Sequence, residues 1–304
     1  MTVSIVMAVY NGEKYLAKQL DSLLEQTYKN FEIYAYDDVS SDSSIEILKT
    51  YAQKDSRVHY VLNDSNKGYA RNFIDGIIAS EADVVFLSDQ DDIWHPQKLE
   101  VMLSVMQKNT EIGMLISDDK AFSESVVVQN LTFFHSPRKN TPNEFLKHGA
   151  YRGMNTVISK KFLNQLKSDV DFNCNSPSHD WMIELIACKL DCMYKMDTIL
   201  AFHRQHNNNT ANLGNDTTNK YTLRVSSTKK KLDIYKWAID NIHSEKIVKI
   251  AKINLKHHSM RLSLLLAPKL KSIFVFFYLL SNALIYGFPK KRVCADFIYS
   301  LRKH

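Results

Sequence analysis

The first 90 residues alternate short β-branched runs with helix-like segments, and this alternation constrains the fold more than any other feature of the sequence. The strand-like runs are Val3–Val9, Phe31–Tyr36, Val58–Leu62 and Val84–Leu87. The segments between them, residues 13–24, 43–51 and 69–80, place apolar residues three and four apart, as amphipathic helices do. The pattern predicts an α/β fold built on a doubly wound, mostly parallel sheet flanked by helices.

Polar residues follow each strand-like run, at the end where a parallel sheet binds its ligands. They are Tyr10–Glu13, Asp37-Asp38, Asn63–Gly68 and Ser88–Asp92. Because the carboxyl ends of parallel strands meet at one edge of the sheet, these residues are expected to converge there, as a nucleotide site requires. Neither GxGxxG nor GxxxxGK(S/T) occurs, which disfavours a dinucleotide-binding Rossmann site and a P-loop.

The sharpest chemical feature is Asp89-Gln90-Asp91-Asp92, which puts three carboxylates in one turn after an apolar strand. Like charges this close repel one another, and a divalent cation removes the repulsion. Oxygen ligands suit Mg²⁺ or Mn²⁺ better than zinc, and such ions commonly bridge the phosphates of a nucleotide. The alternative is a solvated acidic turn before a helix that begins near Pro96. The position at the end of a parallel strand favours the metal site.

Beyond residue 113 the pattern is less regular. Extended structure is expected at Gly113–Ser117, Val126–Phe134, Met154–Ser159 and Lys195–Phe202. Helices are expected at Ser178–Leu190, Lys229–Ile242, Glu245–Leu266, Lys269–Tyr286 and Lys290–Arg302. Val126–Phe134 is alternatively a lid over the site. The Asn- and Thr-rich stretch Thr210–Thr218 is expected to be a loop and the best domain boundary.

The charge of the chain changes sign near this boundary. Residues 1–219 hold 21 basic and 29 acidic side chains, a net charge of −8, whereas residues 220–304 hold 18 basic and 4 acidic, a net charge of +14. We therefore expect two parts, residues 1–215 and a basic helical region at 216–304. A uniformly basic nucleic-acid-binding protein is excluded, but the tail alone suits phosphate. The four cysteines form no CxxC pair, which gives no support to a zinc knuckle.

Six motifs occur in order along roughly the first 95 residues: Val3–Asn11, Leu23–Tyr28, Phe31–Ile33, Asp37–Asp42, Asn66–Asn72 and Ser88–Trp94. Together they resemble the family 2 glycosyltransferases, which have the GT-A fold. Ser88–Trp94, with His179-Asp180-Trp181 and Arg204-Gln205-His206, is most similar to the bacterial rhamnosyltransferase-like branch. The resemblance covers about residues 1–210. It implies a nucleotide-sugar half at about 1–100 and an acceptor half at about 101–215.

The resemblance implies donor-binding roles for residues at the sheet edge. Ala8 and Tyr10 would line the base pocket, with Tyr10 stacked on the pyrimidine, and Asp38 would accept the ring N–H of the base. Lys67 and Arg71 would sit near the base and the phosphates. The remaining donor-binding positions are Glu13 and Arg204.

The resemblance also implies the catalytic chemistry. Asp91 would be the direct metal ligand, Asp89 would hold the ribose or the metal, and His206 would be a third contact to the metal or the pyrophosphate. Asp180 would be the general base that deprotonates the acceptor hydroxyl. Direct attack with one such base inverts the anomeric centre. From the residues alone, a favourable charge in the first turn of a helix is the preferred explanation of Asp180.

Three further features carry weaker signals. Two of them have both a functional and a structural explanation, and the third has a structural explanation only. Asp118-Asp119 is either close to one of the sugars or a solvated turn, and Arg152 is either part of the acceptor floor or an ordinary surface residue. His257-His258 has no metal partner at helical spacing and is expected on a solvated face.

These observations predict an inverting, Mn²⁺- or Mg²⁺-dependent glycosyltransferase of bacterial surface-polysaccharide synthesis (O-antigen, capsule or cell wall). The expected donor is dTDP-L-rhamnose and the expected acceptor a polyprenyl-diphosphate-linked glycan. A UDP-hexose or UDP-N-acetylhexosamine donor is the alternative. More remote alternatives are a nucleotidyltransferase, which needs a basic phosphate loop that Tyr10-Asn11-Gly12 does not supply, and a noncatalytic lipid-binding module, which leaves the acidic strand ends unexplained.

The chain is expected in the cytoplasm, because Thr2–Val9 lacks the basic stretch of a signal peptide. The apolar run Ile273–Phe288 is short of the ~20 residues needed to span a bilayer. Lysines and arginines flank it, as is typical of a helix on an anionic membrane surface. The alternative is a helical subdomain that packs on the catalytic domain or on a second copy in a homodimer. No nucleic-acid partner is expected.

Overall fold

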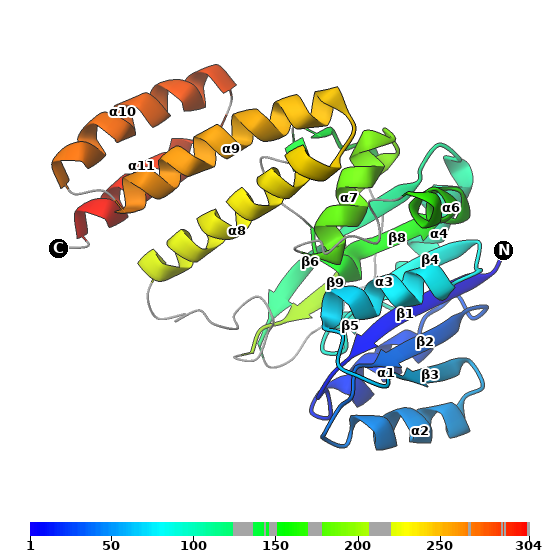
Figure 1. Cartoon of the computed structure of the whole chain (residues 1–304). Helices are drawn as coiled ribbons and strands as arrows, with labels where there is room; N and C mark the ends of the chain where they lie inside the picture. The colour runs from blue at the N-terminus through cyan, green and yellow to red at the C-terminus, as the bar shows by residue number, and fades with distance from the viewer. Residues whose placement is uncertain are drawn as a thin grey trace. The chain divides into compact units, whose positions relative to one another are not determined.

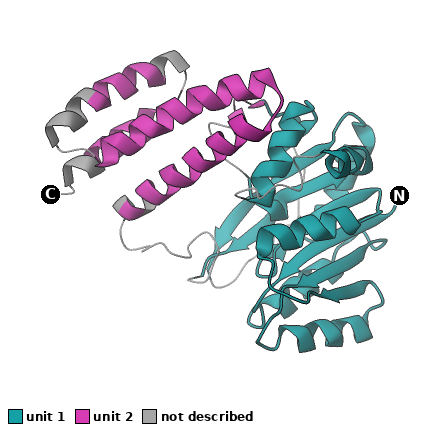
Figure 2. Cartoon of the chain, viewed as in Figure 1, with its two compact units in different colours: residues 1–141, 150–206 teal, residues 142–149, 207–304 magenta. Residues whose placement is uncertain are grey.

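The computed structural model describes residues 1–123, 136–142, 144–145, 151–169, 178–206, 220–266, 269–286, 288 and 290–302. The chain divides into two compact units, shown in teal and magenta in Figure 2. Unit 1 consists of Met1–Thr141 and Ala150–His206, and unit 2 of Pro142–Gly149 and Asn207–His304. The strand or lid predicted at Val126–Phe134 and the loop predicted at Thr210–Thr218 lie outside the described residues.

Unit 1 is built on a sheet that has nine strands within the described residues (Figure 1). Eight of them follow the order β3-β2-β1-β4-β8-β6-β9-β5, and β7 pairs with β9. Their bounds are β1 Val3–Val9, β2 Glu32–Asp37, β3 Val58–Leu62, β4 Val84–Ser88, β5 Ile93–Trp94, β6 Met114–Phe122, β7 Arg138–Lys139, β8 Thr156–Ser159 and β9 Met193–Arg204. The predicted α/β class, with helices flanking a mostly parallel sheet, is confirmed.

The first half of the sheet is parallel throughout. β1 lies between β2 and β4 and pairs with both, and β2 pairs with β3. The register sets Val9 opposite Asp37 and Met7 opposite Ser88, so the residues that follow β1, β2 and β4 share one edge. The helices between these strands are α1 Leu16–Leu24, α2 Ser44–Lys54 and α3 Tyr69–Ala79. The four strands and three helices predicted for the first 90 residues are confirmed.

A continuous apolar core holds this half of the sheet in place. Its fully buried members include Ile5, Met7, Val9, Leu16, Leu20, Leu23, Ile33 and Phe86. Each such side chain contributes about 1.5–3 kcal/mol of transfer free energy. On the other face, α3 lies so close to β1 that a Cβ on Gly76 would come within 2.5 Å of the Val6 side chain. Rigid strands therefore fix the turns that follow them.

The second half of the sheet departs from a parallel arrangement. β8 lies between β4 and β6 and is antiparallel to both, whereas β6 and β9 are parallel. The strand predicted at Met154–Ser159 is wrong in its first two residues, because Gly153–Asn155 forms a 3₁₀-helix. The helices of this half are α4 Lys98–Lys108, α6 Lys160–Ser168 and α7 His179–Lys189. Of these, α6 was not predicted, although the Ser159 hydroxyl caps it by accepting a hydrogen bond from the Phe162 N–H.

Unit 2 includes four long helices among the described residues, drawn from yellow to red in Figure 1. They are α8 Lys220–Asn241, α9 Glu245–Leu266, α10 Lys269–Tyr286 and α11 Lys290–Arg302. The last three match the prediction, but α8 begins at Lys220 and not at Lys229, because its first two turns are too polar to give an apolar stripe. Within the described part of the chain, no helix is long and apolar enough to cross a membrane.

The solvated face predicted at His257-His258 is wrong. The two residues are 5 % and 2 % exposed. The His257 ring stacks on Phe288 with 3.7 Å between ring centroids, and the His258 ring stacks on Tyr235 at 5.2 Å. Helices α8, α10 and α11 all pack on α9, so both rings are covered by neighbours that a local sequence pattern does not reveal.

Candidate active site

The turn after β1 is tied to the turn after β4 by the side chain of Gln90. The Tyr10 N–H donates to Gln90 Oε1 at 2.9 Å, and Gln90 Nε2 donates to the Tyr10 carbonyl at 2.9 Å. A Cβ on Gly12 would lie 2.3 Å from Gln90 Oε1, so only glycine leaves room for this amide. The Tyr10 side chain is 50 % exposed and Ala8 is half-buried, so both are available at the edge. Sequence reasoning gave Gln90 no role.

Asp38, predicted to accept the N–H of the base, organises the loop after β3. Its buried carboxylate accepts hydrogen bonds from the backbone N–H groups of Lys67 and Gly68, both at 2.8 Å, and from Asn63 Nδ2 at 2.9 Å. Gly68 has a φ of 77°, which favours glycine. The carboxylate therefore fixes the backbone that carries Lys67.

Lys67 and Arg71, predicted near the base and phosphates, share one carboxylate. Lys67 Nζ lies 2.9 Å from Asp75 Oδ2 and Arg71 Nε lies 2.7 Å from Asp75 Oδ1. Both cations stay more than a third exposed, so they can also reach a ligand. Asp75 was missed, although its position four residues after Arg71 on α3 is the spacing of a helical ion pair.

Glu13, predicted to bind the donor, connects the turn after β1 to the start of α2. Its Oε2 accepts a hydrogen bond from the Ser43 N–H at 3.0 Å, and its own N–H donates to Asp42 Oδ2 at 3.0 Å. A carboxylate at a helix N-terminus is favoured by the helix dipole. In the described structure Glu13 thus holds the two turns together.

The three aspartates after β4 have different surroundings. Asp91 Oδ2 lies 2.7 Å from His206 Nε2, and both side chains are about one-sixth exposed. Asp92 is fully buried, and its Oδ1 accepts the Arg204 N–H at 3.0 Å and lies 3.1 Å from His203 Nδ1. Asp89 is half-buried and remains at the edge. The turn therefore faces the site with Asp89 and Asp91, and it is anchored by Asp92.

Burial and accumulated negative charge together shift the pKa values of two of these carboxyls. Burial, and then the Asp92 and Asp91 carboxylates, raise the pKa of Asp89 well above its usual range. Burial also raises the pKa of Asp92, whose Oδ2 has no hydrogen-bond partner among the described residues. A bound cation would lower the repulsion between these carboxylates.

Arg204 and His206 fasten the end of β9 to the acidic turn. Arg204 is 4 % exposed, and its guanidinium lies over the rings of Tyr15 and Phe122, at 4.7 and 4.5 Å from their centroids. Its Nε donates to the Asp91 carbonyl at 2.8 Å. The His206 ring packs on Tyr15 at 4.8 Å. Asp91 is thus held by its backbone and by its side chain.

Asp180, the predicted general base, stands in the first turn of α7. Its Oδ1 lies 2.6 Å from His179 Nε2, but the atom has no hydrogen-bond partner in the part of the chain described. His179 is fixed by stacking on Phe73 at 4.2 Å. A Cβ on Gly153 would lie 2.7 Å from Asp180 Oδ1. The charge of Asp180 contributes to the raised pKa of Asp89, so the two carboxylates are close enough to interact.

Two buried ionisable residues beside the site were not predicted. Glu184, one turn after Asp180, is fully buried and accepts the Tyr151 N–H at 3.0 Å; burial and then Asp180 raise its pKa well above the usual range. Lys98 is also fully buried and donates to the Met154 carbonyl. Burial lowers the pKa of Lys98 to about 7 against the opposing pull of three aspartates. No sequence signal separates either from a solvated helix residue.

Asp119, of the pair Asp118-Asp119, takes part in a local hydrogen-bond network. Arg152 Nη1 donates to both oxygens of Asp119, at 3.0 and 2.8 Å, and Asn155 Nδ2 donates to Asp119 Oδ1 at 2.7 Å. Arg152 is close enough to Asp89 for its positive charge to lower the pKa of that carboxyl. Burial and the neighbouring aspartates raise the same pKa by more. Arg152, which is half exposed, therefore lies near the acidic turn.

The donor set fits a divalent cation that is shared with a ligand. Within the residues that are described, no three His, Cys, Asp or Glu side chains converge tightly enough to form a complete cage. Mg²⁺-type sites commonly take only one or two protein carboxylates and complete their coordination with substrate phosphates. Asp91 and Asp89 meet that requirement, with His206 in contact with Asp91.

Comparison with known proteins places this geometry in context. Residues 4–166 match the family model described as glycosyl transferase family 2. The glucosyltransferase WfgD of Escherichia coli, named for UDP-Glc and α-D-GlcNAc-diphosphoundecaprenol, is 32 % identical over 53 % of this chain and 62 % of its own. The dTDP-rhamnosyl transferase RfbG of Shigella flexneri is 28 % identical over 67 % of this chain and 72 % of its own. The chain thus spans less than two thirds of WfgD.

Solved structures share the fold at low sequence identity. TarS 1-349 of S. aureus, solved with UDP-GlcNAc, has a TM-score of 0.64 at 16 % identity and covers 100 % of this chain and 88 % of that one. The mannosyltransferase PcManGT of Pyrobaculum calidifontis, solved with GDP-Man and Mn²⁺, has a TM-score of 0.57 at 12 % identity, with coverages of 99 % and 86 %.

Proposed function

The chain belongs to glycosyltransferase family 2 and has the GT-A fold, and from this premise we propose that it transfers a sugar from a nucleoside diphosphate donor to a lipid-linked glycan, with inversion at the anomeric carbon. The proposal rests above all on one observation. The acidic turn after β4 and Asp180 of α7, about ninety positions apart, lie close enough for their carboxylates to interact. A diphosphate-binding group and a general base must flank the anomeric carbon in this way.

Rhamnose from dTDP-L-rhamnose is the proposed transferred sugar, and the similarity to RfbG over two thirds of the chain supports it. A UDP-hexose donor is the second candidate, supported by the similarity to WfgD, whose name includes UDP-Glc. That name also includes a diphosphoundecaprenol acceptor, which supports a polyprenyl-diphosphate-linked glycan as the acceptor here. The proposed setting is the synthesis of a bacterial surface polysaccharide such as O-antigen.

The donor would lie along the edge formed by the turns after β1, β2 and β4. Tyr10 is exposed for stacking on a pyrimidine, with Ala8 beside it. The Asp38 carboxylate has lone pairs left after its bonds to the loop, so it can still accept the ring N–H of the base. Lys67 and Arg71 would supply positive charge to the donor, while Glu13 and Arg204 would act by holding the turns that surround it.

Asp91 and Asp89, with His206, are the proposed holders of Mn²⁺ or Mg²⁺. When bound, such an ion neutralises the negative charge of the leaving diphosphate. Asp180 is the proposed general base. Its carboxylate, which is about one-fifth exposed and lies 2.6 Å from His179 Nε2, can accept the proton of the acceptor hydroxyl as that hydroxyl oxygen attacks the anomeric carbon. The neighbouring Gly153 leaves space for the Asp180 carboxylate, and the His179–Phe73 stack keeps the residue before Asp180 in place.

The experiment compares Asp180→Asn, Asp91→Asn and the control Glu25→Gln, an exposed carboxylate of unit 1 outside the acidic turn. With Mn²⁺, a panel of dTDP- and UDP-sugars and a polyprenyl-diphosphate-linked acceptor, Asp180→Asn should lower kcat by about 10²- to 10⁴-fold and leave binding of the free nucleoside diphosphate unchanged. Asp91→Asn should weaken Mn²⁺-dependent binding of that nucleotide, and Glu25→Gln should behave as wild type. Full activity of both Asp variants would overturn the site, and a retained anomeric configuration would overturn the one-base mechanism.

A further inference from the structure

The turn that leads into β8 is held by ionisable side chains from three separate elements. It consists of Tyr151, Arg152 and the 3₁₀-helix Gly153–Asn155, and is called the 151–155 turn below. The side chains that hold it are Glu184 of α7, which accepts the Tyr151 N–H at 3.0 Å, Asp119 of β6, which accepts hydrogen bonds from the Arg152 and Asn155 side chains, and Lys98 of α4, which donates to the Met154 carbonyl. The 151–155 turn is therefore fixed to α4, β6 and α7 at once.

Two of these side chains are costly to bury. Glu184 and Lys98 are both fully buried. Among the described residues, Glu184 bonds to a backbone N–H and Lys98 to a backbone carbonyl, and neither has an oppositely charged partner within ion-pair distance. A buried charge without such a partner costs several kcal/mol, and ionisable groups in such surroundings gather at functional sites. The position of the 151–155 turn is therefore expected to matter for function.

The 151–155 turn lies beside both parts of the proposed site. A Cβ on Gly153 would come within 2.7 Å of Asp180 Oδ1, so the turn touches the proposed base. β8 follows the turn and is antiparallel to β4, with Val157 opposite Phe86, so the turn also lies at the end of β4 where the acidic turn begins. Arg152, the cation of the 151–155 turn, is therefore near the base and near the acidic turn.

The Arg152 guanidinium has one edge occupied and one edge open. Its Nη1 donates to both oxygens of Asp119, at 3.0 and 2.8 Å. Within the residues that the structure describes, Nε and Nη2 have no hydrogen-bond partner, and the side chain is 49 % exposed. Nε and Nη2 form the fork that binds two oxygens of a phosphate at once. Asp119 thus holds the guanidinium in place and leaves its phosphate-binding edge open.

We propose that Arg152 is a further substrate-contacting residue, whose Nε and Nη2 bind a phosphate of a diphosphate group. Two diphosphates meet in the proposed reaction, that of the donor and that of the lipid-linked acceptor. In an inverting transfer the leaving diphosphate and the attacking hydroxyl lie on opposite sides of the anomeric carbon. Arg152 is bonded to Gly153, which touches the base that meets the hydroxyl, so the acceptor diphosphate is assigned to it. This assignment rests on the proposed function, whereas the open phosphate-binding edge does not.

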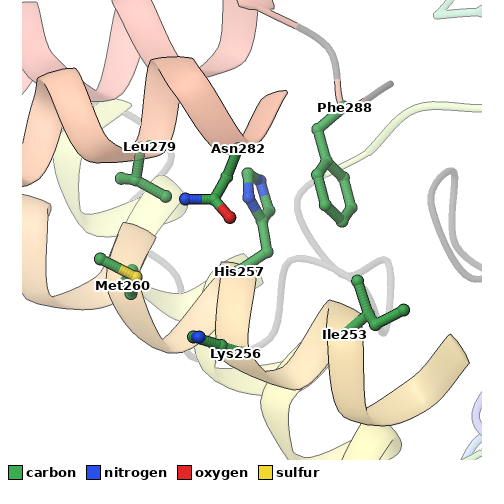
Figure 3. A pocket seen from close by; sticks show the side chains of 7 residues that line it. All are labelled: Ile253, Lys256, His257, Met260, Leu279, Asn282 and Phe288. Atoms are coloured by element: carbon green, nitrogen blue, oxygen red, sulfur yellow. The ribbon is translucent and has the colours of Figure 1, made fainter. Parts of the chain in front are cut away.

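A cavity in unit 2 is too small to be the place for such a group. Figure 3 shows Lys256, His257 and Asn282 on its wall beside apolar side chains. Its volume is about 50 Å³, well below the roughly 300–1,000 Å³ of most small-molecule sites. Burial lowers the pKa of His257 to about 3, so this imidazole offers no charge to a phosphate at neutral pH. The edge of Arg152 is therefore the better match to a diphosphate.

The first test is calorimetric titration of the full chain with farnesyl diphosphate in EDTA, which removes metal-assisted binding at the acidic turn. Arg152→Gln should weaken binding at least about tenfold, because a charge-assisted fork is lost. Arg152→Lys keeps the charge without the fork and should bind with intermediate affinity. The matched control is Arg57→Gln, which should bind as wild type does. Arg57 is also held by an aspartate, Asp55, but it precedes β3 at the opposite end of the sheet.

A second titration separates the donor diphosphate from the acceptor diphosphate. UDP and dTDP with Mn²⁺ are the probes of the donor, and Arg152→Gln should bind both nucleotides as wild type does. Loss of nucleotide binding with unchanged farnesyl diphosphate binding would support the phosphate contact and overturn its assignment to the acceptor.

Three results would overturn the contact itself. The first is Arg152→Gln binding both kinds of probe as tightly as wild type. The second is an equal loss of both, which would show that Arg152 shapes the site without contacting a particular diphosphate. The third is wild type binding farnesyl diphosphate no better than farnesol. Asp180→Asn, which the proposed function expects to be inactive in transfer, should keep its farnesyl diphosphate binding, so a wrong base and a wrong phosphate contact give different results.

Discussion

Gly153 has no side chain and so leaves space for the carboxylate of Asp180, the proposed general base. A Cβ at residue 153 would lie 2.7 Å from Asp180 Oδ1 and 3.0 Å from His179 Nε2, so Gly153→Ala must displace the carboxylate. A misplacement of about 1 Å costs up to 10²-fold in rate. We expect Gly153→Ala to lower kcat at least about tenfold while the donor KM changes less than about twofold. Steady-state kinetics with varied donor measure this split.

The matched control for this change is the same substitution at the donor end. A Cβ at residue 12 would lie 2.3 Å from Gln90 Oε1, the atom that binds the Tyr10 N–H. Gly12→Ala should therefore raise the donor KM more than it lowers kcat. A Gly153→Ala variant that altered only the donor KM would count against Asp180 as the base.

Among the helices, α4 is unusual because its first residue is a fully buried lysine. Burial lowers the pKa of Lys98 to about 7 in the folded chain, whereas the pKa of an unfolded lysine is about 10.4. Between these pH values the unfolded chain binds more protons than the folded chain, so folding stability rises with pH. The cost of the buried charge is therefore complete below pH 7. We expect Lys98→Met to stabilise the fold most at pH 7, which thermal melts will show as the largest rise in melting temperature. The gain in the free energy of unfolding should shrink by roughly 2 kcal/mol towards pH 9.

The control for this prediction is Lys108→Met, at the exposed end of the same helix. It should show no such pH dependence in thermal melts at the two pH values. A loss of stability in Lys98→Met that is the same at both pH values would contradict the prediction, because it would show that the amine stays charged and paired across this range.

Elements encoded by local patterns could be predicted from the sequence, and burial set by distant neighbours could not. Each strand and helix of the first 90 residues is a local run or stripe, and the strand-end rule led directly to the acidic turn. Lys98 and Glu184 are buried by elements far away in sequence, as is His257. The contact that fixes Asp91 comes from His206, 115 residues later, and only the family resemblance drew attention to it.

Over the whole molecule, positive charge and exposed apolar side chains occur together in unit 2. Residues 220–304 carry a net charge of +14. The same region exposes Leu266, Phe277, Tyr278 and Ile298, with Phe277 the most exposed at 61 %. Cations attract the chain to anionic lipid, and aromatic and aliphatic side chains then enter the interface. We therefore propose that this region holds the chain on the inner face of the cell membrane.

Vesicle flotation tests this association. The full chain should float with vesicles of phosphatidylcholine and phosphatidylglycerol but not with phosphatidylcholine alone, and the bound fraction should fall between about 0.1 M and 0.5 M NaCl as charges are screened. Phe277→Ser should weaken binding about tenfold, since burying a Phe side chain is worth about 1.5–3 kcal/mol. Val61→Ser, at an exposed apolar residue of unit 1, should leave binding unchanged. Equal loss in both variants would mean that unit 2 has no special role, because a general apolar surface would then explain the binding.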